Sequence, residues 1–364
     1  MVVVRLTKIV VFITIFFVIC GCQSDDNSTI KTGLKGTLQE TLDIALDTNL
    51  SDSEAGLTMM VVQNGAIKYQ RSKGMANKKN ALPINYKTGF RLASISKTFT
   101  AVATMQLFEQ GLLFLDDSIL QYLPELSPDW QDITIHHLLS HQSGIPDFAN
   151  DLNVSKILPN GITNQNILRY FITHNRLEFE PGTSGDYSNT GYVLLAEIIN
   201  RVTGLTFADY LNQHMFVPMD MQNSYVFDEN AFIRQTDALN HANTTDIFGE
   251  EFHATGTASQ VSSLEDMHKF ISGLLSNDIV EADTLKLMLS RHTPSLSGFE
   301  SSYGYGAFIS PTSDVYNHSG GNDGFRTIFI VNPNKNAYVI FLGNGGDSLP
   351  DLIYLSELAG QFLE

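Results

Sequence analysis

Cysteine is nearly absent from this chain of 364 residues, and both cysteines, Cys20 and Cys22, stand near its beginning. A body without cysteine has no thiol nucleophile, no thiolate zinc site and no internal disulfide. Positive charge is also scarce, since 22 Lys and Arg stand against 39 Asp and Glu, for a formal net charge of −17. Phosphate binding rests on clustered Lys and Arg, so the sequence predicts no nucleic-acid partner.

Long apolar runs are missing as well, because the run Ile9–Ile19 has only eleven residues. At roughly 1.5 Å per residue, such a helix is too short for a bilayer core of roughly 30 Å. Arg5 and Lys8 precede the run. This order of charge and apolar residues is typical of a secretory signal.

The junction Ile19-Cys20-Gly21-Cys22, with polar residues after it, resembles the lipobox of bacterial lipoproteins. The resemblance implies that residues 1–21 are a signal peptide and that Cys22 carries the lipid. Residues 22–36 are then a flexible tether. The expected partner is a bacterial membrane reached through the lipid anchor. The expected location is the cell envelope, either periplasmic or surface-exposed. An ordinary signal peptide with incidental cysteines is the alternative.

The rest of the chain shows helical periodicity in several segments. These are 36–49, Ser94–Gln110, Ile167–His174, Thr190–Thr203, Phe207–Met215, Leu264–Leu275, Ala282–Arg291 and 350–362. Gly111 follows the second segment at the position of a glycine C-cap.

Strand-like runs cluster at both ends of the body. They are Leu57–Gln63, Ala66–Arg71, Tyr303–Ile309, Asp314–His318, Phe325–Val331 and Ala337–Leu342. Asn64-Gly65 between the first two predicts a hairpin, and residues 332–335 predict a turn between the last two. We expect an α/β (α+β) fold, in which both chain ends build an antiparallel sheet flanked by helices.

One domain, 37–364, is then expected to have two lobes. The sheet lobe takes about 37–110 and 300–364, and a mainly helical lobe takes about 111–299. A cleft between two lobes is the natural place for a site.

Ser94-Ile95-Ser96-Lys97 is the first motif that carries chemistry. Its spacing puts Ser94 and Lys97 on one helical face, one turn apart. A serine needs an adjacent base to become a nucleophile, and a lysine can be that base when burial lowers its pKa. Backbone N–H groups at a helix start can receive an oxyanion. Taken alone, the tetrapeptide also fits an N-cap serine with a solvated lysine.

Two more motifs follow along the chain. Tyr187-Ser188-Asn189 offers a phenol that can exchange a proton with a lysine and an amide that can bond a lysine and a carbonyl. A turn that caps the helix beginning near Thr190 is its alternative interpretation. At the end of a predicted strand, the glycines that follow His318-Ser319 let a substrate backbone approach closely.

These three motifs in this order closely resemble the serine β-lactamase and penicillin-binding protein superfamily, in its class C-like branch. The segments FRLASISKTFTA, LDDSILQYLPE, ITIHHLLSHQSGIPD and NHSGGNDGF carry the resemblance further. It runs from about residue 36 to the C-terminus.

The resemblance implies a role for each residue. Ser94 is the acylated serine, and Lys97 and Tyr187 are its general-base pair. Asn189 holds Lys97 and the substrate amide. His318, Ser319 and Gly320 bind substrate from an edge strand, and the N–H groups of Ser94 and Gly321 form the oxyanion hole. The implied acyl-enzyme mechanism requires no metal or cofactor.

The third motif departs from the Lys-Thr-Gly of true class C β-lactamases, because it reads His318-Ser319-Gly320. An imidazole that is mostly neutral near pH 7 replaces a permanent ammonium. We therefore expect a D-alanyl-D-alanine carboxypeptidase-like peptidase or an esterase of the envelope. A class C-like β-lactamase and a non-catalytic penicillin-binding protein are the alternatives. The substrate is a D-amino-acid peptide, an ester or a β-lactam, and the sequence predicts no oligomeric state.

Other candidate sites lack their defining residues. His137 and His141 stand four apart, but Leu138 follows His137 where a zinc-protease helix has Glu. No Gly-x-Ser-x-Gly elbow, phosphate-binding loop or dinucleotide fingerprint occurs in the sequence. We expect His136, His137 and His141 to lie on a packing helix and the loop after it, and Trp130 to be a core residue.

Overall fold

The computed structural model describes residues 37–150, 162–241, 252–293, 296–322, 324–346 and 349. The predicted signal peptide, Cys22, the tether and the predicted helix 350–362 lie outside these residues. Among the described residues, no helix has the length and apolar character needed to cross a membrane.

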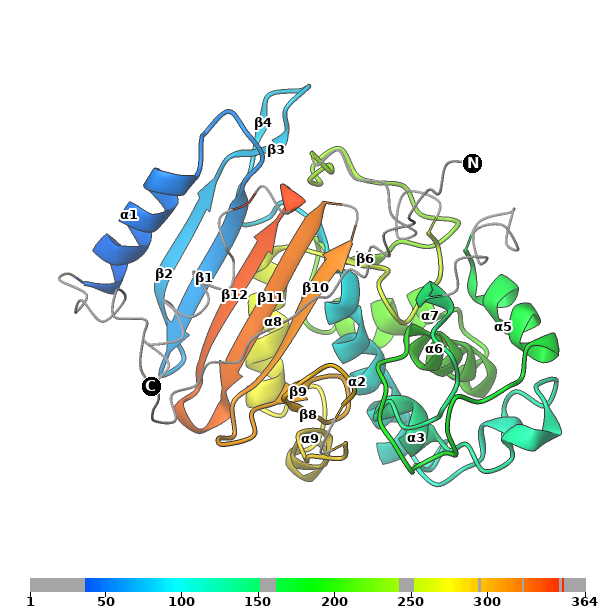
Figure 1. Ribbon diagram of the computed structural model, residues 1–364. Helices are drawn as coiled ribbons and strands as arrows, with labels where there is room; N and C mark the ends of the chain where they lie inside the picture. Colours follow the sequence, from blue (N-terminus) through cyan, green and yellow to red (C-terminus); the bar gives the residue numbers. More distant parts are fainter. Residues whose placement is uncertain are drawn as a thin grey trace, which may run out of the picture.

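A seven-stranded antiparallel sheet is built from both ends of the chain, as the sequence predicts. Its order is β2-β1-β12-β11-β10-β9-β8. The strands are β1 Leu57–Gln63, β2 Ala66–Lys73, β8 Ser302–Tyr303, β9 Phe308–Ile309, β10 Tyr316–Asn322, β11 Phe325–Asn332 and β12 Ala337–Gly343. Figure 1 shows the N-terminal hairpin in blue beside the C-terminal strands in orange and red.

The predicted turns form, because their residues adopt the backbone dihedral angles that such turns need. Asn64 and Gly65 both have positive φ, 52° and 72°, which a tight type I′ hairpin needs. Residues Pro333–Lys335 make a 3₁₀ turn, after which Asn336 is left-handed. Gly111 also has a positive φ, of 67°, so the predicted C-cap is confirmed.

Helices cover both faces of the sheet (Figure 1). Helix α1, Leu38–Asn49, begins at a capping box between Thr37 and Glu40 and packs with alternate residues of β1 and β12 in a separate apolar cluster. The larger core covers the opposite face and continues into the helical lobe. Trp130 is fully buried in this larger core, as predicted.

The remaining helices supply the second lobe and the helices behind the sheet. They are α2 Ser96–Glu109, α3 Ile135–Leu139, α5 Asn164–Thr173, α6 Asn189–Thr203, α7 Phe207–Leu211, α8 Leu264–Leu275 and α9 Ala282–Met288. A π-helical turn, Asn212–Phe216, follows α7, and short 3₁₀ turns occupy 93–95, 119–121, 128–130 and 148–150.

The expected boundary of the helical lobe is wrong at α8. This helix falls within 111–299 but packs on the sheet, where Tyr338 of β12 bonds Ser272 (2.7 Å) and His268 (2.6 Å) of α8. The strong apolar stripe of α8 needs a partner surface, and the sheet provides it.

Two small sheets also lie where the sequence analysis expected none. Strands β5 Phe90–Arg91, β6 Tyr225–Val226 and β7 Gln260–Ser262 form a sheet of order β5-β7-β6, and β3 Met75–Asn77 pairs with β4 Leu82–Pro83. Runs of two or three residues are too short to show a strand period.

Two predicted strands have different bounds. The run Tyr303–Ile309 is two short strands, β8 and β9, because Gly304 and Ala307 close a turn between them (N···O 2.9 Å). His318 does not end its strand, since β10 continues through Gly320 and Gly321 to Asn322. Glycines are tolerated there because β11 pairs with them along the whole segment.

Candidate active site

Ser94 lies in a 3₁₀ turn, Ala93–Ile95, between β5 and α2. The turn is tied on two sides, because Leu92 N–H donates to the Gln260 carbonyl (2.8 Å) and Thr327 Oγ1 donates to the Leu92 carbonyl (2.8 Å). Ala93 has a φ of 49°, which is uncommon for a residue with a side chain and recurs at functional sites. Ser94 is partly exposed, whereas both of its neighbours are buried.

Lys97 is fully buried one turn into this segment. Its Nζ lies 3.3 Å from Ser94 Oγ, 2.7 Å from Asn189 Oδ1 and 3.1 Å from the Thr257 carbonyl oxygen. Burial lowers the pKa of Lys97 to about 7, although the nearby Asp147 carboxylate raises it.

The partners of Lys97 fit a neutral amine. A neutral amine has two N–H bonds and one lone pair, whereas an ammonium has three N–H bonds. The amide oxygen of Asn189 and the carbonyl of Thr257 can only accept, so they take two N–H groups. In the neutral amine the lone pair is then left for the Ser94 hydroxyl, whereas in the ammonium the third N–H donates to Ser94 Oγ.

Asn189 begins α6 and connects Lys97 to a carboxylate. Its Nδ2 donates to Asp147 Oδ2 (2.9 Å) and its backbone N–H donates to Asp147 Oδ1 (3.2 Å). Thr257 Oγ1 also donates to Asn189 Oδ1 (2.6 Å). Burial raises the pKa of Asp147 to about 6, while its hydrogen bonds and Lys97 oppose the rise.

Asp147 and Thr257 are site residues that the sequence analysis did not assign. Asp147 ends the ITIHHLLSHQSGIPD segment, so the resemblance covered it without a role. Thr257 acts through its backbone carbonyl as well as its side chain. Because every residue has a backbone carbonyl, the residue type does not indicate this role.

Tyr187 lies beside Ser94 and Lys97. Lys97 Nζ is 4.8 Å from the centroid of the Tyr187 ring. Burial raises the pKa of Tyr187 well above its ordinary value, and a hydrogen bond with Ser94 opposes the rise. The phenol is therefore protonated at neutral pH. Ser188 is the N-cap of α6 and accepts from Gly191 N–H (3.4 Å).

The structure does not present the His318 imidazole to a substrate, contrary to the prediction. The side chain is 1% exposed. Its Nδ1 bonds the Ser319 carbonyl (2.7 Å), and its Nε2 bonds the Tyr303 hydroxyl (3.1 Å). Burial, together with the nearby Lys97, lowers the pKa of His318 to about 3. The ring is neutral and its two nitrogens are already used.

The glycines after His318 bring β10 against the turn that holds Ser94. A Cβ on Gly320 would lie 2.2 Å from the Leu92 carbonyl oxygen, so only glycine permits this approach. Ser319 and Gly321 are partly exposed. Beyond Asn317, β10 pairs with β11 alone, so this end of β10 is an edge, as the resemblance implied.

A cavity of about 310 Å³ lies next to Asp147. Aromatic side chains line part of it and polar ones the rest: Pro146, Asp147, Phe148, Tyr170, Phe171, Thr173, His174, Asn175 and Arg176. Asp147 thus borders both the Lys97 network and this cavity.

The three histidines of the ITIHHLLSHQSGIPD segment have separate partners. His136 Nδ1 bonds the Tyr305 hydroxyl (2.7 Å), and His137 Nδ1 accepts from Thr134 N–H at the start of α3 (3.3 Å). His141 Nδ1 accepts from Ser188 N–H (3.1 Å). Within the described parts of the chain, no group of three or more His, Cys, Asp or Glu is arranged to hold a metal ion.

Comparison with known proteins decides the family. The Beta-lactamase family profile matches residues 37–364. The chain belongs to the Beta-lactamase family. Members and structural neighbours of this family are serine hydrolases, and the chain is one of them.

A curated relative of this Beta-lactamase family chain is penicillin-binding protein 4* of Bacillus subtilis. It is 28% identical over 317 residues, which is 79% of this chain and 67% of the relative. The protein flp of Staphylococcus aureus is 26% identical and is matched over 65% of its length. The chain therefore spans about two thirds of these relatives.

Solved structures of the family have the same fold. The octameric penicillin-binding protein homologue of Pyrococcus abyssi superposes with a TM-score of 0.77 at 26% identity, over 89% of this chain and 77% of that one. The D-amino acid amidase of Ochrobactrum anthropi, solved with D-phenylalanine, has a TM-score of 0.75 at 25% identity, over 90% and 97%. The predicted fold class is confirmed.

Proposed function

We propose that this hydrolase cleaves amide or ester bonds of small D-amino-acid peptides through an acyl-enzyme on Ser94. The observation that carries the proposal is the buried Lys97 amine, whose Nζ lies 3.3 Å from Ser94 Oγ and is held by Asn189 Oδ1 and the Thr257 carbonyl. A buried amine with a pKa near the working pH suits a general base.

Acylation then proceeds with the protons balanced. Lys97 Nζ takes the Ser94 hydroxyl proton as Oγ bonds the substrate carbonyl carbon. The N–H groups of Ser94 and Gly321 stabilise the oxyanion. As the carbon–nitrogen bond breaks, Tyr187 donates its phenolic proton to the departing nitrogen and recovers a proton from Lys97. This assigns Tyr187 the part of an acid in acylation, because its pKa is raised above the neutral range.

Deacylation reverses these transfers with water in place of the amine. Water bonds the acyl carbon while its proton passes to the Lys97 and Tyr187 pair. The carbon–Oγ bond then breaks, and Ser94 Oγ regains a proton. Asn189 keeps Lys97 oriented throughout, and its own amide group is held by Asp147.

The neutral state of His318 bears on the substrate. A buried imidazole with a pKa of about 3 offers no charge to a substrate carboxylate. This favours D-aminoacyl amides and short esters, and it disfavours substrates recognised mainly through a free carboxylate. The D-amino acid amidase of similar fold supports the same class.

We also propose that the enzyme works at the cell envelope, anchored to a bacterial membrane through a lipid on Cys22. The Ile19-Cys20-Gly21-Cys22 junction and the basic, then apolar, residues before it support this placement.

A substrate panel tests the proposal. Purified enzyme is given a D-alanyl-D-alanine peptide, its C-terminal amide, a D-aminoacyl amide, its L-enantiomer, a short-chain ester and a cephalosporin. We expect kcat/KM for the amidated peptide to equal or exceed that for the free acid, and D to exceed L. Rapid turnover of the cephalosporin alone would make the enzyme a β-lactamase and contradict the proposal.

A further inference from the structure

His141 stands outside the three motifs, yet it lies against the catalytic tyrosine. It follows α3 in a turn and is 1% exposed. Its φ is 59°, in the left-handed region that is uncommon for residues with a side chain. Backbone strain of this kind persists where the surroundings hold it in place.

His141 binds the chain on both sides of Tyr187. Its carbonyl oxygen accepts from Asp186 N–H (3.0 Å). Its ring Nδ1 accepts from Ser188 N–H (3.1 Å). One residue therefore satisfies the backbone N–H groups immediately before and immediately after Tyr187.

The His141 ring also packs against the phenol itself. The two ring centroids are 4.4 Å apart with planes at 36°. Tyr303 lies on the same imidazole at 4.5 Å. The Phe308 ring is also parallel to the Tyr187 ring, with 6.2 Å between their centroids. The imidazole thus packs against the phenol ring that lies beside Ser94.

The hydrogen bond at Nδ1 also determines the form of the ring. Since Nδ1 accepts a hydrogen bond from Ser188 N–H, the neutral ring carries its proton on Nε2. Nε2 is buried and has no hydrogen-bond partner among the described residues. Burial, with Lys97 and His318 nearby, keeps the pKa of His141 well below its ordinary value. The neutral ring remains an acceptor for Ser188 across the working pH range.

We propose that His141 is a positioning residue, which sets the place and angle of the Tyr187 phenol through its bond to Ser188 N–H and the contact of its ring with the phenol ring. The inference rests on the proposed acyl-enzyme mechanism, in which Tyr187 protonates the leaving group. A misplaced phenol should then impair the departure of a poor leaving group far more than that of a good one.

The matched variants are His141→Asn and His141→Gln. In His141→Asn, the amide Oδ1 takes the place of the imidazole Nδ1 and can accept from Ser188 N–H. Asparagine also tolerates the left-handed backbone. In His141→Gln, the side-chain amide is one carbon further from the backbone, so no acceptor atom occupies the position of Nδ1. A melting curve for each protein shows whether it is folded.

The measurement compares two substrates with the same D-acyl group. One is an alkyl amide, whose nitrogen must be protonated as it leaves, and the other is a nitrophenyl ester, whose phenolate leaves without a proton. We expect His141→Gln to lower kcat for the amide at least about tenfold and to change ester acylation less than about threefold. His141→Asn should restore amide turnover to within about threefold.

A third comparison uses Tyr187→Phe, which has no proton to position. Adding His141→Gln to it should cost no further amide activity, because two changes that act through one group are not additive.

An equal loss on both substrates, equal losses in His141→Asn and His141→Gln, or a further loss in the double variant would overturn the inference. If the native enzyme turned over neither substrate, the proposed function itself would fail. If His141→Gln does not fold, His141→Ala takes its place in the same comparisons, since it also removes the acceptor for Ser188 N–H.

Discussion

At the scale of single residues, the behaviour of Lys97 decides how the enzyme depends on pH. Its pKa is lowered to about 7, and only the deprotonated amine can take the proton of Ser94. Below this pKa the ammonium predominates, so kcat/KM for an amide should fall about tenfold per pH unit, and above it kcat/KM should level off.

The matching measurement is kcat/KM between about pH 5 and pH 9, with protein stability checked at each pH. His318, with a pKa of about 3, contributes no ionisation in this range. A profile that is flat, or that falls as pH rises through 7, would contradict the assignment of Lys97 as the base.

Asp147 offers a sharper form of the same prediction. Its negative charge raises the pKa of Lys97, so Asp147→Asn should lower that pKa and move the acidic limb of the profile to lower pH. Above pH 8 the variant should lose no more than about tenfold, because an amide oxygen can still accept from Asn189. A limb that stays in place, or that moves to higher pH, would show that Asp147 does not act through Lys97.

The site residues of the three motifs could be predicted from the sequence, because each motif is a recognisable run of three or four residues. Asp147, Thr257 and His141 could not. Each acts through a partner more than forty residues away, and two of these bonds use backbone atoms. The burial of His318 was missed for a related reason, because Tyr303, its partner, carries no signature of that role.

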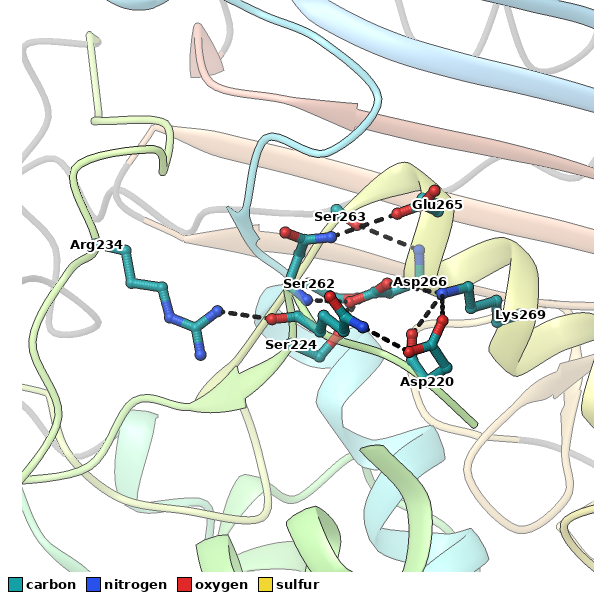
Figure 2. Close-up of polar contacts among 10 residues, drawn as sticks. Asp220, Ser224, Arg234, Ser262, Ser263, Glu265, Asp266 and Lys269 are labelled. Atoms are coloured by element: carbon teal, nitrogen blue, oxygen red, sulfur yellow. Dashed lines mark hydrogen bonds and ion pairs between the residues drawn. The ribbon is translucent and has the colours of Figure 1, made fainter. Parts of the chain in front are cut away.

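At the scale of secondary structure, the junction of β6, β7 and α8 holds the segment that supplies Thr257. Figure 2 shows Asp266 of α8 at its centre. The buried carboxylate accepts from Asn223 N–H (2.7 Å) and Ser224 Oγ (2.8 Å) through Oδ2. Ser263, the N-cap of α8, accepts in turn from Asp266 N–H (3.2 Å).

Asp266→Ala should lower the free energy of unfolding by about 1–3 kcal/mol, because Asn223 N–H is left without its acceptor. Asp266→Asn is the control, since it keeps an acceptor oxygen and removes a buried charge whose pKa is raised by burial. Urea unfolding of both variants measures the difference. An equal free energy of unfolding in Asp266→Ala and the native protein would contradict this role of Asp266.

Long periodic elements were predictable and short or glycine-rich ones were not. Helix α6 and strand β12 follow clear apolar patterns, and the structure has them at nearly the expected residues. Strand β10 was placed too early, because Gly320 and Gly321 read as a loop. The missing side chain of Gly320 serves instead to bring the strand against Leu92.

At the scale of the whole molecule, both chain ends meet in one sheet, as the distribution of strand-like runs predicted. The assignment of α8 to the helical lobe was wrong because sequence order alone cannot say which surface an apolar stripe covers. The N-terminal region stays a prediction, and it can be tested in the intact chain.

In a bacterial host supplied with a labelled fatty acid, the native chain should incorporate the label and enter the membrane fraction. Cys22→Ser should abolish incorporation, whereas Cys20→Ser should retain it. Two signals, a lipid and a secretory leader, would then account for the location. Equal labelling of the Cys22→Ser chain would contradict lipidation at this residue.

The most direct test of the central claim is the site of acylation. A fluorophosphonate probe and a penicillin are each incubated with native enzyme, Ser94→Ala and Lys97→Ala, and the digested proteins are read by mass spectrometry. The account predicts a single adduct on Ser94 in the native enzyme, none in Ser94→Ala, and formation slowed by at least about 10²-fold in Lys97→Ala. No adduct on Ser94 with either reagent, or an equal rate without Lys97, would contradict it.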